Sequence, residues 1–551
     1  MSYMFKLLPV LLACILIIPI VLQYTLHFHI IINNKITTSI YGIYLLVYLL
    51  IQFVFSYLNN LGYYNIKKET LLTTEFSQNL NIISKPLINL IVVGYKEDPI
   101  YYKTCLESIK TSVSNILNLN KVFVIIDGND PDDQYMVNSF LETFTKNSTH
   151  INLINHENSD ELFVTEHIYD INNNDIICIS QKHHGKRSAM FTGFQLSLLE
   201  KNLYNKNIET VFCTDSDTTI TPECLNIMFK KFENIHVGAV VGNLSIYNKY
   251  DSVISFLSSL RYWYAFNLER AYQSFTGSVL CVSGPIGMYR LSSLEKIIES
   301  WKNQTFLGKK CTYGDDRHLS NKILGLKQLI IYTPLAYAET ETPIDIYRFY
   351  KQQVRWNKSS FREFFWNIFI LHNHSLFMTV DIIYVFVYPC IVMSYLLYIL
   401  WIGTIFELGL YFCILITLGM IKSTYAYFVT KRFEHLFYFL YTFIYICICF
   451  PAKIWALINI NDNSWGTSTR KILKNDISID IFIPIIWNIV LLTGFILNIN
   501  KHVHNNNTQF NDYILIITPF SLSIFFYFAL SIYIYTKRKH ISEKVLFDKT
   551  V

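Results

Sequence analysis

The distribution of apolar residues along the chain is the strongest constraint on how it can fold. A helix needs about 20 apolar residues to cross a bilayer, and stretches of that kind occur only toward the two ends of the sequence. Between residues 58 and 376 the chain has no uninterrupted apolar span and carries most of the charge. We therefore predict a polar domain inserted between two sets of membrane helices. The candidate apolar segments are 7–32, 40–58, 376–400, 402–429, 436–458, 481–497 and 513–535.

Composition supports this division and excludes several protein classes. Only 16% of the residues are charged, against about 25% in an ordinary soluble domain, so a simple soluble protein is excluded. The net charge of +5 is small and dispersed, which argues against a nucleic-acid partner. The eleven cysteines form neither a CxxC pair nor an evenly spaced disulfide framework, and we interpret them as reduced thiols.

The placement of basic residues predicts which side of the membrane each part occupies. Lys and Arg concentrate on the cytosolic side, and basic clusters at 67–68, 431–432 and 537–539 follow the second, fourth and last apolar segments. If the fifth segment crossed the bilayer, the basic residues at 470–474 would lie on the extracytosolic side of the membrane. We therefore predict six spans, an interfacial or re-entrant helix at 431–460, and cytosolic polar domain and termini.

These predictions divide the chain into consecutive regions. The first apolar segment could instead be a lipoprotein signal ending near Cys14, but its apolar run continues past that residue. The predicted regions are two spans in 1–60, a cytosolic domain at 61–344, amphipathic interface helices at 345–375, two spans in 376–430, the interfacial or re-entrant helix at 431–460, a cytosolic loop at 461–478, two spans in 479–536 and a cytosolic basic tail at 537–551.

Short apolar runs alternate with helical patterns through the polar domain, which favours an α/β fold with a mostly parallel sheet. Neither GxxxxGK[ST] nor GxGxxG occurs, so a P-loop ATPase and a dinucleotide enzyme lack their signatures. The predicted strands are 87–93, 121–126, 176–179, 211–213, 237–241, 279–282 and 329–332.

Carboxylates stand where two of these strands should end. Asp127 follows one predicted strand, and Asp215 and Asp217 follow another. Ligands bind at the carboxyl ends of strands in open parallel sheets, and two acids one residue apart suit Mg²⁺ or Mn²⁺ together with substrate phosphates. A solvated turn is the alternative for such a tripeptide. The preceding strand and the other acidic motifs favour the metal site.

Two further polar motifs stand at predicted loop-to-helix transitions. Lys186 in the run 183–187 precedes a helical pattern, where a cation beside free backbone donors suits a diphosphate; a basic helix face is the alternative. Asp315 and Asp316 offer a general base for an attacking hydroxyl, although helix capping would also explain them. The adjacent histidines at 183–184 are not assigned to a metal.

The run Gln352-Gln353-Val354-Arg355-Trp356 lies on an amphipathic stretch before the third span. It combines a guanidinium group that suits a diphosphate with an aromatic plane that suits a sugar ring. An Arg-Trp pair at this place is also an ordinary interfacial anchor.

Taken in order, these motifs resemble those of processive family 2 glycosyltransferases, and among them the hyaluronan synthases. The resemblance rests on Asp127 in Ile-Ile-Asp-Gly, Asp215-Ser216-Asp217, and the runs 283–290, 314–321, 340–343, 352–363, 451–453 and 464–470. It covers most of the chain.

The resemblance implies a GT-A-like cytosolic domain and a role for each matching residue. It implies uridine contacts at Tyr95 and Asp127, diphosphate contacts at Lys186, Asp215 and Arg355, metal ligands at Asp217 and Asp215, a catalytic base at Asp316 beside Asp315, substrate contacts at Gln352 and Cys281, an acceptor platform at Trp356, and a gating loop at 461–478 with Trp465, Thr467 and Arg470. For Cys281 a buried strand thiol is an equal alternative.

The function implied is polymerisation of UDP-GlcNAc and UDP-GlcUA into hyaluronan with Mg²⁺ or Mn²⁺. The enzyme would lie in the plasma membrane, contact membrane lipid and pass the nascent polysaccharide through its spans; the oligomeric state stays open. The nearest alternative is a chitin or chitin-oligosaccharide synthase that uses UDP-GlcNAc only. A non-processive lipid-linked sugar transferase and an inactive membrane scaffold are more distant alternatives, and the intact acids argue against the scaffold.

Overall fold

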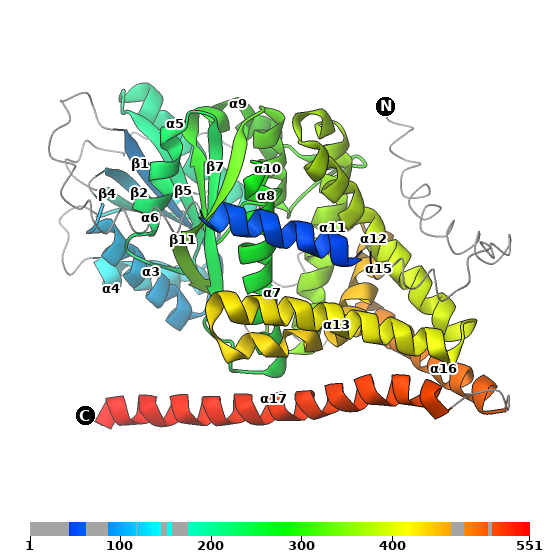
Figure 1. The fold of residues 1–551 in the computed structure, drawn as a ribbon. Helices are drawn as coiled ribbons and strands as arrows, with labels where there is room; N and C mark the ends of the chain where they lie inside the picture. Colours follow the sequence, from blue (N-terminus) through cyan, green and yellow to red (C-terminus); the bar gives the residue numbers. More distant parts are fainter. Residues whose placement is uncertain are drawn as a thin grey trace.

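A computed structural model describes the polar domain and most of the C-terminal helices (Figure 1). The residues it describes are 43, 45–61, 86–116, 118–144, 151–156, 175–463, 479–504 and 510–550. Of the predicted N-terminal spans, the first lies outside these residues, and the second corresponds to an apolar helix at 45–61.

The polar domain is built on a nine-stranded sheet with the strand order β3-β4-β2-β1-β5-β8-β7-β11-β6. All neighbouring strands are parallel except where β8 meets β5 and β7 and where β6 meets β11. The mostly parallel sheet is therefore confirmed. The strands are β1 (Leu87–Gly94), β2 (Leu119–Ile126), β3 (Ile151–His156), β4 (Asp175–Gln181), β5 (Ile208–Asp215), β6 (Thr219–Ile220), β7 (Val237–Ile246), β8 (Gly287–Arg290) and β11 (Leu329–Thr340), with a separate hairpin of β9 (Thr305–Phe306) and β10 (Lys309–Lys310).

Helices cover both faces of this sheet. The side chain of Ile91 lies against Gly193 of α5, whereas a side chain at Gly94 would meet Met136 of α4. Positions 91 and 94 of one strand point to opposite faces, so α4 and α5 lie on opposite sides. Strands covered on both faces become nearly continuous apolar runs, which explains why β1 and β2 were predictable. The helices of this domain include α3 (Pro99–Val113), α4 (Gln134–Phe144), α5 (Lys186–Leu203), α6 (Cys224–Phe229), α9 (Leu291–Lys302) and α10 (Asp315–Gly325).

The predicted strand at 279–282 is wrong. Val279 and Val282 are completely buried, but this segment contributes only an isolated bridge between Ser278 and Ile330. A short apolar run indicates burial and does not distinguish a paired strand from an irregular core segment. The strand in this part of the sheet is β8, whose four residues begin at a glycine and give little sequence signal.

Four helical segments of the described residues are long and apolar enough to cross a membrane. They are α12 (Leu376–Trp401), α13 (Ile405–Thr430), Phe433–Ile458, and Phe482–Val503 within α16 (Phe482–His504). The third of these is not a regular α-helix. It contains a 3-10 stretch η5 (Phe433–Leu440), α14 (Tyr441–Ile444), a π-helical turn η6 (Tyr445–Cys449) and α15 (Phe450–Ile458).

Pro451 follows the π-helical turn and lacks the N–H that a continuous α-helix would need. This explains the change of helix type within the predicted region 431–460. Whether the segment crosses the bilayer, re-enters it or lies in its interface stays a prediction.

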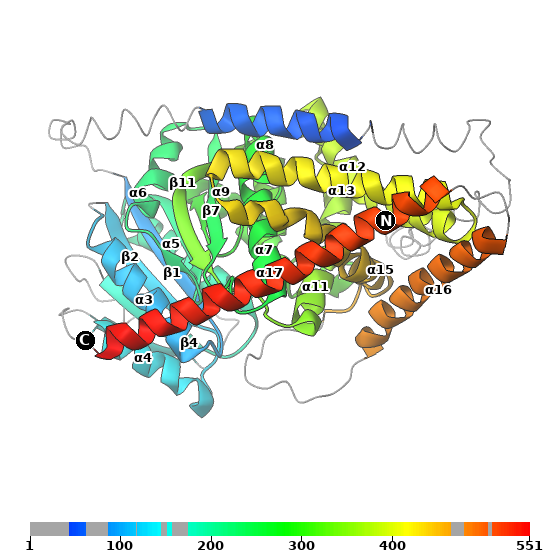
Figure 2. The same ribbon diagram turned by 60° about the horizontal axis from the view of Figure 1, so that its bottom comes forward.

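Two of the predicted regions form long, continuous helices. The predicted interface helices at 345–375 form one 23-residue helix, α11 (Ile346–Ile368), followed by the short turn η4 (Leu371–Asn373). The last span and the basic tail form a single helix, α17 (Phe510–Thr550), which runs past α13 and α7 (Figure 2). The basic residues 537–539 therefore continue the apolar helix and do not begin an irregular tail.

The polar domain and the helix bundle are interlocked. After β7, the chain forms α7 (Val253–Tyr264), a π-helical turn η3 (Ala265–Arg270) and α8 (Ala271–Phe275). The ring of Tyr264 stacks on Tyr438 with centroids 3.9 Å apart, and its hydroxyl donates to the Lys422 carbonyl oxygen of α13. Lys249 forms an ion pair of 2.9 Å with Glu434 of η5. These contacts hold the carboxyl end of the sheet against the membrane helices.

Gly242 in β7 tests the packing between the sheet and the segment that precedes β8. A methyl group at this position would overlap the Ile286 side chain and approach the Ala336 carbonyl oxygen to 2.9 Å. Gly242→Ala should therefore destabilise the purified full chain by about 1–3 kcal/mol, the usual cost of overpacking, which thermal unfolding in detergent would measure. Gly325→Ala is the matched control, because its nearest contact would be Ile370 at 3.6 Å. Equal melting temperatures would contradict the packing described.

Candidate active site

A cavity of about 1020 Å³ lies at the carboxyl ends of β1, β2 and β5 and extends between the membrane helices. Its wall includes Tyr95 and Asp217 from the sheet domain and Asp381 and Tyr388 from α12. Every predicted site residue within the described part of the chain borders this cavity: Tyr95, Asp127, Lys186, Asp215, Asp217, Cys281, Asp315, Asp316, Gln352, Arg355 and Trp356. The predicted loop residues Trp465, Thr467 and Arg470 lie outside the described residues.

An aromatic stack stands at the ends of β1 and β4. The rings of Tyr95 and His183 are nearly parallel, with centroids 4.0 Å apart. The buried carboxylate of Asp127 accepts hydrogen bonds from the backbone N–H groups of His184 and Gly185 at 3.1 and 2.8 Å, and its Oδ2 lies 2.9 Å from His183 Nδ1. This hydrogen bond raises the pKa of His183 and favours the imidazolium form. Asp127 therefore orders the loop that carries the stack.

His183 is a site residue that the sequence prediction missed. Adjacent histidines on a polar run usually lie on the surface, and no spacing linked this one to Tyr95 or Asp127. The sequence signal for it was its position two residues before Gly185, the glycine that precedes α5, where the chain turns back to the strand ends.

Lys186 and Asp215 form an ion pair beside this stack, with Nζ and Oδ1 2.5 Å apart. Burial opposes the charge on Lys186, but the carboxylates of Asp215, Asp315 and Asp316 outweigh it and raise the pKa of the ammonium group. Gly284 is required here, because a Cβ at that position would lie 2.5 Å from Lys186 Nζ. Lys186 is also the first residue of α5, so its charge adds to the free N–H groups at the start of that helix.

The carboxylates at the end of β5 fit a hard divalent cation. Asp215 and Asp217 present carboxylate oxygens two positions apart in the sequence. The Thr218 hydroxyl donates a hydrogen bond to Asp217 Oδ1 at 3.0 Å. Among the described residues no group of three or more His, Cys, Asp or Glu side chains could hold a metal. Mg²⁺ and Mn²⁺ commonly take one or two carboxylates and complete their coordination with phosphate oxygens and water, so the pair suits a nucleotide-bound cation.

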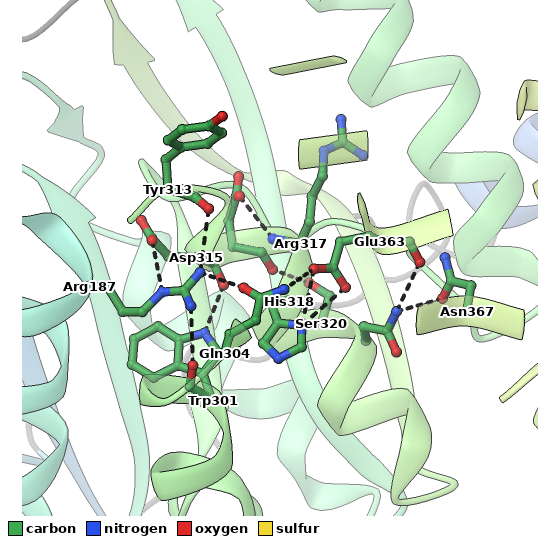
Figure 3. A network of polar contacts seen from close by, with 12 residues as sticks. Arg187, Trp301, Gln304, Tyr313, Asp315, Arg317, His318, Ser320, Glu363 and Asn367 are labelled. Atoms are coloured by element: carbon green, nitrogen blue, oxygen red, sulfur yellow. Dashed lines mark hydrogen bonds and ion pairs between the residues drawn. The ribbon is translucent and has the colours of Figure 1, made fainter. Parts of the chain in front are cut away.

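The two adjacent acids of α10 have different surroundings. Asp315 is 6% exposed and accepts a hydrogen bond of 3.2 Å from Arg187 Nε, as Figure 3 shows. Asp316 is half-buried, and its Oδ2 accepts from the Cys281 thiol at 3.3 Å. Burial, with Asp316 as the next cause, raises the pKa of Cys281 to about 11, so the thiol stays a donor. Asp315 is therefore engaged in an ion pair, and Asp316 is the acid better suited to act as a base.

Helix α11 contributes polar and aromatic groups to the cavity wall. Gln352, Arg355 and Trp356 all border the cavity. The ring of Trp356 meets Tyr262 of α7 edge to face, with centroids 6.1 Å apart. Gln352 Oε1 is buried and has no hydrogen-bond partner among the described residues, which is unusual for a buried polar atom. Tyr262 was not predicted, because it is one of many aromatic residues on an apolar helix.

The start of the predicted gating loop is firmly anchored. Arg362 of α11 donates from Nε to the Ile460 carbonyl oxygen at 2.9 Å, and Lys358 pairs with Asp462 at 2.9 Å. Tyr313, just before α10, donates to the Asp462 carbonyl oxygen at 2.7 Å. The described end of this loop, up to residue 463, is therefore held beside the cavity.

Comparison with known proteins places this chain in a family. A family model described as chitin synthase matches residues 201–480. A solved mannosyltransferase from Pyrobaculum calidifontis, in complex with GDP-Man and Mn2+, covers 78% of this chain and 99% of its own, but its 15% identity and TM-score of 0.38 are too low to bear on the fold or the ligands.

Similarity to curated proteins is much stronger. Hyaluronan synthase 2 of Homo sapiens is 36% identical over 515 residues, which cover 91% of this chain and 89% of that protein. Hyaluronan synthase 2 of Gallus gallus is 36% identical over the same shares. Hyaluronan synthase 3 of Homo sapiens is 36% identical over 84% of this chain and 82% of that protein. The chain therefore belongs to the hyaluronan synthase family and is a membrane hexosyltransferase.

Proposed function

We propose that this chain polymerises hyaluronan from UDP-GlcNAc and UDP-GlcUA and passes the polymer through its own membrane helices. The observation that carries the proposal is a continuous cavity that joins the strand ends to the helix bundle. A nucleotide site and a path for the product are then parts of one continuous space. The similarity to hyaluronan synthases over 91% of the chain supports the choice of sugars.

The donor nucleotide would bind at the ends of β1, β2 and β5. The stack of Tyr95 on His183 offers a flat surface for the uracil ring. Lys186 at the start of α5 and Arg355 of α11 would hold the diphosphate from two sides. Asp127 supports this site by ordering the loop of His183, since its carboxylate already accepts hydrogen bonds from that loop.

Asp217 and Asp215 would hold Mg²⁺ or Mn²⁺ at the diphosphate. When bound, such a cation neutralises charge that develops on the departing diphosphate. Lys186 and Arg355 act on the same charge from the protein side, in a cavity where such interactions are stronger than in water.

Asp316 would take the proton from the acceptor hydroxyl as that oxygen attacks the anomeric carbon of the UDP-sugar. The new glycosidic bond forms as the bond to UDP breaks, and the configuration at the anomeric carbon inverts. The Cys281 thiol and the Arg317 backbone N–H donate to the two oxygens of this carboxylate at 3.3 and 2.8 Å. These hydrogen bonds hold the base toward the acceptor.

The acceptor sugar would rest on Trp356, which Tyr262 supports edge to face. Beyond this platform the cavity wall includes Asp381 and Tyr388 of α12. A chain extended at Trp356 would therefore move between the membrane helices as it grows. In this arrangement the sheet domain and both termini are cytosolic, the membrane is the plasma membrane, and its lipids surround the spans.

The substrate test uses the purified protein with each UDP-sugar alone and with both together. We expect high-molecular-weight polymer only when both are present, and we expect hyaluronidase to degrade it. The chitin synthase model that matches residues 201–480 makes chitin synthesis the second candidate. Polymer formed from UDP-GlcNAc alone and degraded by chitinase would replace the first proposal by the second.

Asp316→Asn should abolish polymer formation, because the amide cannot accept the proton of the acceptor hydroxyl. A general base contributes about 10²–10⁴-fold to a rate, so turnover should fall by at least about 100-fold. UDP affinity, measured by calorimetry, should change little, since the nucleotide site lies at Tyr95 and Lys186. Elongation at the parent rate in this variant would remove Asp316 as the base.

Gly284→Ala should weaken diphosphate binding without unfolding the protein. The new methyl group would meet the end of the flexible Lys186 side chain and displace its ammonium group from Asp215. We expect about a 10-fold loss of UDP affinity, the size of one charged hydrogen bond, with an unchanged melting temperature. Gly325→Ala again serves as the control. Unaltered UDP affinity in Gly284→Ala would contradict the proposed role of Lys186.

A further inference from the structure

A buried polar network lies at the wall of the cavity and joins elements that are far apart in sequence (Figure 3). Its central side chains are Arg187, Gln304, Asp315, His318 and Glu363, and none is more than 6% exposed. The reaction proposed above uses none of these five as a substrate contact. Their burial therefore calls for another explanation.

Glu363 of α11 is the centre of this network. Its Oε1 accepts from Gln304 Nε2 at 2.7 Å and lies 3.0 Å from His318 Nδ1, while Oε2 lies 3.1 Å from the same nitrogen. Gln304 continues the network, because its Oε1 accepts from Arg187 Nη2 at 2.8 Å. Arg187 in turn binds Asp315. Three helices, α5, α10 and α11, are thus connected through side chains alone.

Each of these helices carries a residue of the proposed reaction close to the network. Lys186 precedes Arg187 in α5, and Asp316 lies two residues before His318 in α10. On α11, Trp356 stands seven residues before Glu363, which is about two helical turns along the same face. A shift at Glu363 would therefore move the base and the acceptor platform relative to each other.

The energetics indicate a positional role for this network. A buried charged pair is often no more stabilising than apolar side chains of the same shape, whereas removing one partner leaves costly unpaired groups. The carboxylate of Glu363 is thus not needed simply to fill space between α10 and α11. Its role is instead to orient the helices, because its hydrogen bonds to Gln304 and His318 fix how the helices are placed relative to one another.

The two nitrogens of His318 are not equivalent. Nδ1 faces Glu363, whereas Nε2 is buried without a hydrogen-bond partner among the described residues. A proton on Nε2 would be a buried donor with nothing to accept it, which costs more than an unpaired lone pair on this ring. The tautomer with its proton on Nδ1 is therefore favoured over the one with its proton on Nε2, and Nδ1–H donates to Glu363.

We infer that Glu363 and His318 are positioning residues, which hold Asp316 of α10 at its working distance from the acceptor platform of α11 through the Nδ1–H hydrogen bond. The inference rests on the proposed function. It assigns these residues to the turnover step and not to nucleotide binding, since neither reaches the site at Tyr95 and Lys186.

Two substitutions of His318 distinguish the effect of losing the Nδ1–H hydrogen bond from the effect of losing the imidazole ring. The side-chain nitrogen of Asn occupies the place of Nδ1, and that of Gln occupies the place of Nε2. His318→Asn keeps a donor to Glu363, and we expect kcat for polymer formation within about threefold of the parent. His318→Gln loses that donor, and kcat should fall by about 10–100-fold, the effect of misplacing a reacting group by about 1 Å.

The accompanying measurements distinguish positioning from general damage. KM for both UDP-sugars and the affinity for UDP should stay within about twofold in both variants. Glu363→Gln, which keeps the shape of the side chain, tests the same contact from α11 and should lower kcat without changing KM. If His318→Gln does not fold, Glu363→Gln still tests this hydrogen bond. Melting temperatures of all purified variants accompany the kinetics.

The outcomes separate this inference from the proposed function. If the parent protein makes no hyaluronan, the proposed function fails whatever the variants do. If the parent makes polymer and His318→Asn and His318→Gln have equal kcat, the Nδ1–H hydrogen bond is not the positioning contact. A parallel rise in KM and loss of UDP affinity would likewise overturn the inference and indicate a structural role only.

Discussion

The packing of α11 between the sheet domain and the segment Phe433–Ile458 is the contact on which the rest of the structure depends. On one side, Glu363 binds His318 of α10. On the other, Arg362 donates to the carbonyl oxygen of Ile460. Because these neighbouring residues point in different directions around the helix, α11 joins the polar domain to the end of the segment Phe433–Ile458 through buried hydrogen bonds. Gln352, Arg355 and Trp356 then line a cavity that belongs to both parts.

Electrostatics shape the interior of that cavity. Parallel strands end at one edge of the sheet, so acids after different strands gather there and repel one another. The structure balances them locally, with Lys186 against Asp215 and Arg187 against Asp315. A bound diphosphate would add negative charge to this edge, which is consistent with a cation beside it and with a helix start that points its N–H groups the same way.

Much of the fold was predictable because its causes are local. Strands such as β1 and β2 are buried on both faces and therefore form continuous apolar runs, and the membrane helices are longer and more apolar than anything in the sheet domain. The failure at 279–282 has the same origin, since burial without strand pairing leaves the same apolar pattern. The short antiparallel β8 was missed because four residues that begin with glycine carry no periodic signal.

The order of residues was enough to predict four long apolar helical segments, the mostly parallel sheet and the acids, bases and aromatics that now border one cavity. Only the tertiary structure gave different surroundings to Asp315 and Asp316, which are adjacent and chemically alike. Successive residues of a helix point about 100° apart, so one carboxylate meets Arg187, which is 128 positions away, and the other meets Cys281. Such partners come from distant parts of the chain, and no local pattern encodes them. The same reason explains why His183 and Glu363 became visible only in the folded molecule.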